Sequence, residues 1–209
     1  MASAAEARVP LTRARICAAA RAQIEAVGLA GLSLREVARS LGVSAAALYA
    51  HVDGKRGLVA AVAEDAFEGL GARFAAIDAA DPIDHLRAQS RAYVDYALEA
   101  PNLYQVMMAF EPQLPGLALH EARDEIQLER ATAVFGSAMR AVDAAIAADL
   151  LVLDDPTLVA LILWASVHGL VGSLTSGLDL PVTVRAQFVD AAIETTIRGL
   201  VRPDHPASR

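Results

Sequence analysis

The sequence predicts an all-α fold of about nine helices, in which a three-helix domain with a helix-turn-helix precedes a larger helical domain. Apolar residues recur at helical spacing through most of the 209 residues, and no segment shows the alternation typical of a half-buried strand. Residues that start and stop helices interrupt that pattern at regular places. Hydrophobic residues make up 55% of the chain, an excess that indicates a buried oligomer interface or a lined cavity.

The first helix is predicted to begin after Thr12, whose hydroxyl suits an N-cap, and to end where Gly28 follows. One face of this segment is apolar and is expected to pack inward. The residues of that face are Ile16, Ala20, Ile24 and Val27. Cys17, in the same segment, is the only cysteine, so no intrachain disulfide can form.

Two short helices separated by a glycine are predicted next. Ser33 and Glu36 have the spacing of a capping box, which starts the first of them. Gly42 follows where a sharp turn needs a residue that tolerates positive φ. Ser44 suits the N-cap of the second helix, which is expected to run through His51. Two short helices joined in this way are a DNA-reading arrangement.

This segment resembles the DNA-binding domain of the TetR family of transcriptional repressors, over about residues 12–60. The matching residues are Ala38, Gly42, Val43, Leu48, Tyr49, His51, Val52, Lys55 and Leu58. They include the Tyr-x-His-Val-x-x-Lys form of the tetracycline repressor itself. Many family members have an aromatic residue at the position of Val52 and polar residues at 45–47, where this chain has alanines, and the second difference bears on which DNA is read.

The residue types in this segment suit contacts to a duplex. Tyr49 and His51 can donate hydrogen bonds to phosphate oxygens, and Lys55 adds a positive charge at the first turn of the following helix. Arg35 and Ser44 are the candidates for base edges, whereas an alanine methyl can only pack on a thymine methyl. The alternative is that these are ordinary surface residues of a small helical domain. The predicted DNA-binding residues are Arg35, Ser44, Ala45, Ala46, Tyr49, His51 and Lys55.

Charge is distributed unevenly along the chain. The net charge is −7, yet residues 1–60 hold eight basic and four acidic side chains, so the negative charge belongs to the rest. A basic first segment on an acidic body directs DNA to one end of the molecule. Catalytic and metal motifs such as GxSxG, GxxxxGK[ST] and HExxH are absent from the sequence, and the five histidines are scattered. We therefore expect no enzyme, no metal and no cofactor.

The remaining helices follow from their caps. Asp53 suits the N-cap of a fourth helix whose apolar face continues to Ile77, long enough to join the two domains mechanically. Asp81 and Asp155 each precede a proline, the N-cap and N1 pair of a helix start. The further helices are expected at 82–99, 101–110, 117–148, 156–176 and 181–200. The predicted domains are 1–58 for DNA binding and 59–209 for ligand sensing and dimerisation.

Large, adaptable side chains gather in the second domain. Methionine and tyrosine together fill irregular space and accept varied apolar partners, and a buried indole or imidazole needs a hydrogen-bond partner that a ligand could supply. The predicted ligand-binding residues are Tyr93, Tyr104, Met107, Met108, Phe110, Trp164 and His168. Plain core packing is the alternative interpretation, including a core histidine that bonds a neighbouring carbonyl.

The stretch WASVHG at 164–169, with PNLYQVMM upstream, resembles the C-terminal domain of a TetR subfamily marked by a Trp, His, Gly signature. That resemblance implies a domain that senses a small molecule, without naming it. Small residues beside the signature let a second helix approach closely, which suits a dimer interface formed by this helix and the last one. The predicted interface residues are Ala165, Gly169, Gly172, Ser173, Ser176, Phe188 and Ala192.

A membrane span is the rival interpretation of residues 157–178, which contain no Asp, Glu, Lys or Arg. Several polar residues within the segment and the acidic flank at 154–155 count against it. We therefore expect a cytoplasmic homodimer without membrane contact, a repressor released from a palindromic DNA operator by a small apolar effector. A DNA-binding regulator without an effector is the other alternative.

Overall fold

The computed structural model describes residues 10–110 and 128–204, which form nine α-helices and no named strand. The helices are α1 (Arg13–Val27), α2 (Leu34–Ser40), α3 (Ala45–Leu48), α4 (Gly54–Ala75), α5 (Pro82–Glu99), α6 (Pro101–Met108), α7 (Glu129–Ala147), α8 (Pro156–Thr175) and α9 (Val182–Leu200). The all-α prediction is confirmed. Of the helix predicted at 117–148, the part at 117–127 lies outside the described residues.

Four of the predicted caps are formed by the expected side chains, those of Thr12, Ser44, Asp81 and Asp155, whereas Asp53 at the start of α4 makes no side-chain cap. The Thr12 hydroxyl accepts a hydrogen bond from the Arg15 amide at 3.3 Å. The Asp81 carboxylate accepts from the Ile83 amide at 2.8 Å, and Asp155 accepts from the amides of the second and third residues of α8. A charged acceptor at a helix start satisfies amides that the helix itself leaves unpaired, so these aspartates fix where α5 and α8 begin.

The predicted capping box at the start of α2 is wrong. Ser33 makes no side-chain cap, and the Glu36 carboxylate instead accepts from Arg39 Nη2 at 2.6 Å. The Ser33 amide, which Glu36 was expected to bond, donates to Gln23 Oε1 of α1 at 3.2 Å. Arg39 therefore binds the Glu36 carboxylate and Gln23 binds the Ser33 amide, the two groups that a capping box would have joined.

Two further predictions near the N-terminus need correction. Val27 is 57% exposed rather than buried, because α1 ends there and Gly28 turns the chain at φ +74°. The helix predicted to reach His51 ends at Leu48, after which His51 and Val52 donate their amides back to the Leu48 carbonyl as a turn.

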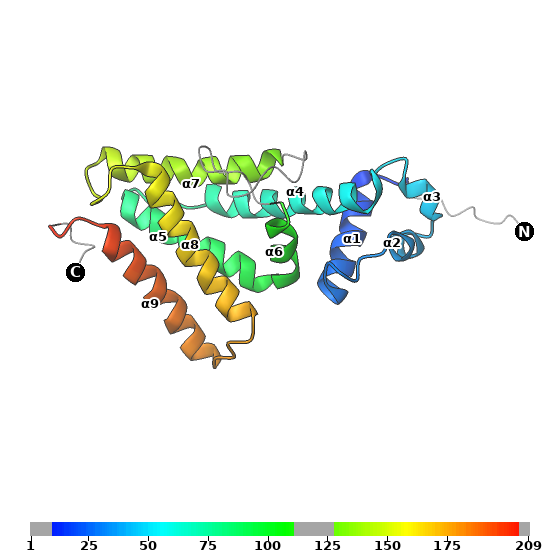
Figure 1. The fold of residues 1–209 in the computed structure, drawn as a ribbon. Helices are drawn as coiled ribbons and strands as arrows, with labels where there is room; N and C mark the ends of the chain where they lie inside the picture. Colours follow the sequence, from blue (N-terminus) through cyan, green and yellow to red (C-terminus); the bar gives the residue numbers. More distant parts are fainter. Residues whose placement is uncertain (1–9, 111–127, 205–209) are drawn as a thin grey trace, which may run out of the picture.

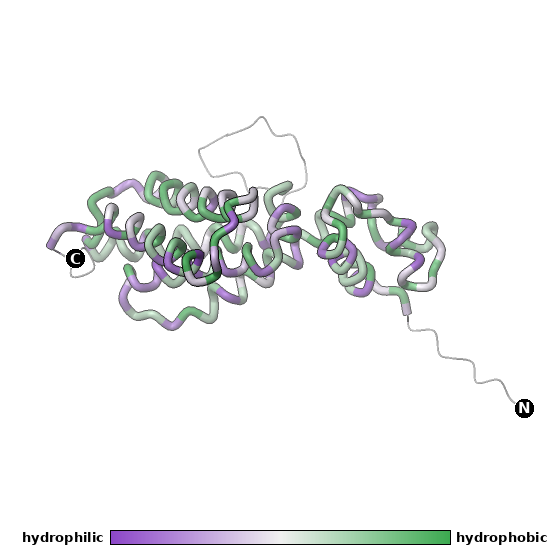
Figure 2. Tube along the Cα trace, turned by 90° about the horizontal axis from the view of Figure 1, so that it is seen from below, coloured by the Kyte–Doolittle hydropathy of each residue, from purple (hydrophilic) through white to green (hydrophobic). Residues whose placement is uncertain are grey.

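The helices divide into a small bundle and a larger body joined by α4. Figure 1 shows α1–α3 at one end and α5, α7, α8 and α9 at the other, with α4 running between them. Figure 2 shows the same division from below, with hydrophobic stretches in both parts. α4 packs against α1, α6 and α7, whereas α5 packs against α7, α8 and α9.

Two clusters of buried side chains form the core. The first cluster combines residues of α1–α4 with Leu103 and Met107 of α6, and the second combines α5, α7, α8 and α9. Because Leu58 and Phe67 of α4 belong to the same first cluster, the small bundle and the adjoining part of the body share one core. The predicted domain boundary at 58 falls inside α4.

α8 is long and apolar enough to cross a membrane by length and composition alone. Its buried residues nevertheless pack into the second core cluster, with α5, α7 and α9 as neighbours. A core helix of a folded domain has the same composition, so this feature does not favour the membrane alternative.

Candidate functional site

The turn between α2 and α3 presents the predicted DNA-reading residues. Gly42 adopts φ +68°, and the Ser44 hydroxyl accepts from the Ala47 amide at 3.3 Å to start α3. Leu48 and Val52 are buried and hold this segment on the first core cluster. The segment therefore forms a helix-turn-helix, and its buried residues hold the exposed ones in place against the first core cluster.

The outer surface of this segment contains most of the predicted residues. Tyr49 is 61% exposed, and its neighbour His51 is exposed as well. The side chains of Arg35, Ser44, Ala46 and Lys55 are also exposed, with Lys55 in the first turn of α4. Ala45 differs, since it is partly buried against the core.

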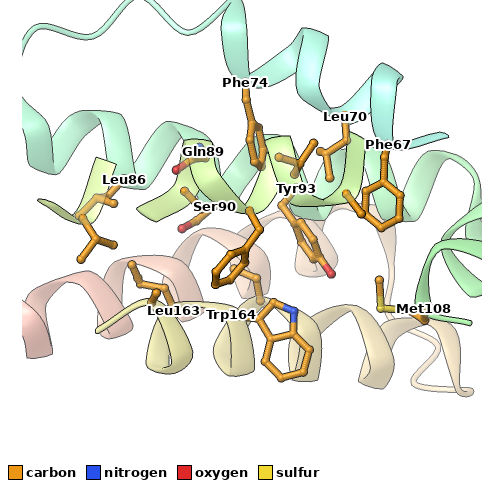
Figure 3. A pocket seen from close by; sticks show the side chains of 17 residues that line it. Phe67, Leu70, Phe74, Leu86, Gln89, Ser90, Tyr93, Met108, Leu163 and Trp164 are labelled. Carbon is orange, nitrogen blue, oxygen red and sulfur yellow. The ribbon is translucent and has the colours of Figure 1, made fainter. Parts of the chain in front are cut away.

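A cavity lies in the body between α4, α5, α7 and α8. Its volume is about 130 Å³, compared with roughly 10–15 Å³ for a site that holds one water. Figure 3 shows Phe67, Leu70 and Phe74 pointing from α4 toward Trp164 of α8. The lining residues are Phe67, Leu70, Phe74, Leu86, Gln89, Ser90, Tyr93, Met108, Ala131, Val134, Phe135, Ala138, Val142, Ala160, Leu163, Trp164 and Val167.

The cavity wall is apolar apart from a few groups on α5 and one indole. No Asp, Glu, Lys, Arg or His is among the described lining residues. Gln89 and Ser90 are buried, and the Gln89 Nε2 atom has no hydrogen-bond partner among the described residues. This wall can hold an apolar molecule by contact and can orient it by a few hydrogen bonds.

Three of the predicted ligand-binding residues, Tyr93, Met108 and Trp164, line the cavity. Tyr104, Met107, Phe110 and His168 do not line it. Met107 is only 1% exposed because α6 turns it into the core with α1 and α4.

Tyr104 and His168 form a polar cluster directly behind the wall. The Tyr104 hydroxyl lies 2.5 Å from His168 Nδ1 and 3.4 Å from the Tyr93 hydroxyl. The His168 ring stacks on Trp164 with centroids 4.7 Å apart. Tyr104 belongs to α6 and His168 to α8, so this cluster links the cavity wall to α6.

The sequence interpretation missed Gln89 and Ser90. Both fall within the inward stripe of α5, one turn from Leu86 and Val94, where apolar residues are the rule. Polar residues inside an apolar stripe were the available signal. Phe67 and Phe74 were recognised only as the apolar face of a connecting helix, and Phe135 of α7 was not singled out.

One face of α8 and α9 is apolar and exposed in the single chain. Phe188 is 38% exposed and Val184, one turn before it on α9, is 43% exposed, although both are large apolar side chains. A Cβ atom added at Gly169 or Gly172 of α8 would meet nothing within 4 Å. The remaining predicted interface residues, Ala165, Ser173, Ser176 and Ala192, are exposed or half-buried. Among the described residues no group of three His, Cys, Asp or Glu side chains could hold a metal ion.

Comparison with known proteins follows the same division of the chain. Residues 16–62 match the family model of bacterial regulatory proteins of the tetR family. Residues 86–198, more than half of the chain, match the tetracyclin repressor-like C-terminal domain. A comparison with curated proteins finds no match.

Solved structures share the fold over nearly the whole chain. A Rhodococcus sp. RHA1 protein of unknown function is 27% identical, with a TM-score of 0.78 over 95% of this chain and 100% of that one. A tetracycline repressor variant from Acinetobacter baumannii in complex with minocycline is 19% identical, with a TM-score of 0.66 over 91% and 96%. SmeT, the repressor of a Stenotrophomonas maltophilia multidrug efflux pump, is 22% identical, with a TM-score of 0.65 over 94% of each chain.

The helix-turn-helix at one end and the helical body correspond to the two domains that the family models match. TetR-family proteins are DNA-binding regulators rather than enzymes, which accords with the sequence prediction. The chain belongs to the TetR family and is a DNA-binding transcriptional regulator.

Proposed function

We propose that this regulator is a repressor that leaves a palindromic operator when a small molecule occupies the cavity. One observation carries the proposal: α4 has Lys55 in its first turn, beside the reading helices, and continues to Phe67, Leu70 and Phe74 in the cavity wall. A ligand that moves this wall acts on the same rigid helix that carries the DNA contact.

The proposed DNA contacts fall into two classes. Tyr49, His51 and Lys55 bind phosphates and position the protein, whereas Arg35 and Ser44 reach base edges. Ala46 is exposed and can pack on a thymine methyl, and the half-buried Ala45 contributes mainly to the support of α3.

The proposed dimer joins the exposed faces of α8 and α9 to the same faces of a second copy. Gly169 and Gly172 leave room for a close helix, and Phe188 would lose its exposure to water there. A twofold dimer presents two helix-turn-helix segments, one from each subunit, which we call the reading heads. Their twofold symmetry accounts for a palindromic site. Residues 1–58 and 59–209 remain the proposed DNA-binding and sensing parts.

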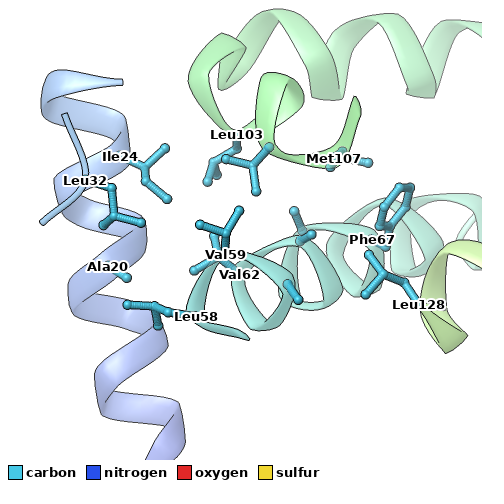
Figure 4. Close-up of a cluster of buried hydrophobic side chains, with 14 of the residues drawn as sticks. Ala20, Ile24, Leu32, Leu58, Val59, Val62, Phe67, Leu103, Met107 and Leu128 are labelled. Atoms are coloured by element: carbon cyan, nitrogen blue, oxygen red, sulfur yellow. The ribbon is translucent and has the colours of Figure 1, made fainter. Parts of the chain in front are cut away.

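We propose that α6 transmits occupancy of the cavity. At its start Asn102 donates to the Glu25 carbonyl of α1 at 3.1 Å, and at its middle Tyr104 meets His168 behind the cavity. Figure 4 shows Leu103 and Met107 pointing from α6 toward α1 and α4. A displaced Trp164 would thus shift α6 against both helices and change the separation of the two heads. Tenfold release requires the effector to favour the released arrangement by only about 1.4 kcal/mol.

The Trp-His-Gly resemblance at 164–169 supports this assignment, because the stacked pair Trp164 and His168 stands between cavity and α6. The minocycline complex of the Acinetobacter protein and the role of SmeT as the repressor of an efflux pump support a ligand-responsive repressor of this fold. Such a regulator acts in the cytoplasm as a homodimer.

DNA selection from random duplexes, followed by titration at several salt concentrations, tests the DNA part. We expect a palindrome with half-sites about 34 Å apart and an affinity that falls steeply with salt. Tyr49→Phe and Lys55→Ala should weaken all sequences alike, whereas Arg35→Ala should cost about 1–3 kcal/mol at one base pair. Arg140→Ala on α7 removes one exposed positive charge far from the heads and is the matched control. An unchanged affinity and salt slope for Lys55→Ala would contradict the phosphate role.

The effector part is tested on the selected operator. Compounds that release the wild-type protein are assayed on Trp164→Ala and His168→Ala. Variants that fold, dimerise and bind the operator but no longer respond support transmission through this pair, whereas a full response from both refutes it.

A further inference from the structure

We infer that the effector is an uncharged, largely apolar molecule whose acceptor oxygen pairs with the side-chain amide of Gln89. The inference rests on the proposed function and deepens it, because it specifies the chemistry that the cavity accepts. Three features carry it: the absence of charged residues in the described wall, the unpaired Nε2 donor of Gln89, and the aromatic rings that line the same cavity.

The wall selects against charged ligands. None of its described residues is an Asp, Glu, Lys, Arg or His, so a buried carboxylate or ammonium group would lose its hydration without gaining a counter-charge. His168 lies behind Trp164, stacked on its ring, and its Nδ1 atom is already within hydrogen-bond distance of Tyr104. A neutral ligand avoids this desolvation penalty.

Gln89 supplies the hydrogen bond that orients the ligand. Its side chain is 5% exposed, and its Nε2 donor is paired with nothing in the described part of the chain. An unpaired buried donor is unfavourable, so a hydrogen bond from this donor to an acceptor oxygen of a ligand favours binding. The terminal torsion of a glutamine is soft, which lets the amide turn its nitrogen toward a ligand in the cavity.

The hydroxyl of Tyr93, which also lines the cavity, already has a hydrogen-bond partner. The Tyr93 hydroxyl lies 3.4 Å from the Tyr104 hydroxyl, on the side of α6. The wall also contains the Ser90 hydroxyl and the Trp164 indole, but among its described donors only Gln89 Nε2 is a fully buried atom without a hydrogen-bond partner. The rings of Phe74, Phe135 and Trp164 also line the cavity and suit a ligand that is itself ringed.

Three shape-matched probes test the inference on the full-length protein. Benzophenone has an acceptor oxygen, diphenylmethane lacks it, and 4-benzoylbenzoate adds a negative charge. Binding constants come from calorimetry. Trp164 is the only tryptophan of the chain and lines the cavity, so its fluorescence reports where each probe binds.

We expect the wild-type protein to bind benzophenone about tenfold more tightly than diphenylmethane, and 4-benzoylbenzoate more weakly than either. Gln89→Met keeps the length of the side chain but removes the donor, so the tenfold preference should disappear. Gln105→Met, an exposed glutamine on α6, is the matched control and should keep it. Thermal melts establish that each variant is folded.

Equal binding of the two neutral probes, a preference that survives in Gln89→Met, tighter binding of the charged probe, or no binding of any probe would each overturn the inference. Operator binding is measured separately in the absence of probes. Loss of the DNA activity would refute the proposed function, whereas the benzophenone preference tests only the chemistry of the cavity.

Discussion

The turn between the two reading helices depends on the backbone angle of one residue. Gly42 has φ +68°, a region that L-residues with a Cβ atom adopt at a cost of roughly 1–2 kcal/mol. A Cβ added there would meet nothing within 4 Å, so packing adds no further penalty. The cost of a substitution at this position is therefore conformational.

We predict that Gly42→Ala lowers the free energy of unfolding by about 1 kcal/mol and that Gly42→Asn lowers it by less. Asparagine adopts this conformation more readily than alanine because its side chain bonds the local backbone. Urea unfolding of both variants checks the prediction. Equal losses for the two would show that the backbone angle is not the cause.

Signals between neighbouring residues in the sequence predicted most of the helix caps correctly. Such signals could not include hydrogen-bond partners that come from another helix. Thr12, Asp81 and Asp155 cap helices as expected because each acceptor and its amide lie within three residues. The capping box of Ser33 failed because Gln23, from another helix, reaches the same amide. Gln89 was missed for a related reason: only the packed structure shows that it lines an apolar cavity.

At the scale of elements, an ion pair between Arg87 and Glu194 joins α5 to α9. Glu194 accepts hydrogen bonds from Arg87 Nε at 2.8 Å and from Arg198 Nε at 2.9 Å. The hydrogen bond from Arg87 is the main reason that the pKa of Glu194 lies below its usual value. A carboxyl whose pKa is lower in the folded state stabilises the fold above its unfolded pKa, and that stabilisation is lost as the pH falls through the folded value.

We predict that the wild-type protein loses more stability than Glu194→Gln between pH 6 and pH 3, by less than about 1 kcal/mol because the pair is partly exposed. Chemical unfolding at a series of pH values measures this difference. Asp78→Asn, on the exposed connection between α4 and α5, controls for the loss of one carboxylate. A pH dependence identical in wild type and Glu194→Gln would refute the role of this pair.

The helix bounds could be predicted more fully than the cavity. α5 begins and ends where its caps predict, at Pro82 and Glu99, because the signals lie within the segment. The cavity is lined by residues of α4, α5, α6, α7 and α8, and the rotation of α6 about its axis decides whether Met107 or Met108 faces it. That rotation depends on packing between helices, which periodicity along one helix does not specify.

At the scale of the whole molecule, assembly is expected to depend on the exposed stripe of α8. We predict that Gly172→Glu splits the proposed dimer, since a carboxylate buried between close helices without a partner costs several kcal/mol. Sedimentation measures the change. Ala144→Glu, on an exposed position of α7, adds the same charge elsewhere and should leave the dimer intact. A dimer that persists in Gly172→Glu would place the interface on another surface.

The shared core of the small bundle and the body limits how such a regulator can be recombined. A hybrid cut after residue 58 would keep Ile24 and Leu58 but replace Leu103 and Met107, which belong to the same buried cluster, with foreign side chains. The exchangeable unit therefore extends through α4 and α6. A transplanted reading head must bring with it the two helices proposed to report ligand occupancy, so DNA preference and responsiveness would be inherited together.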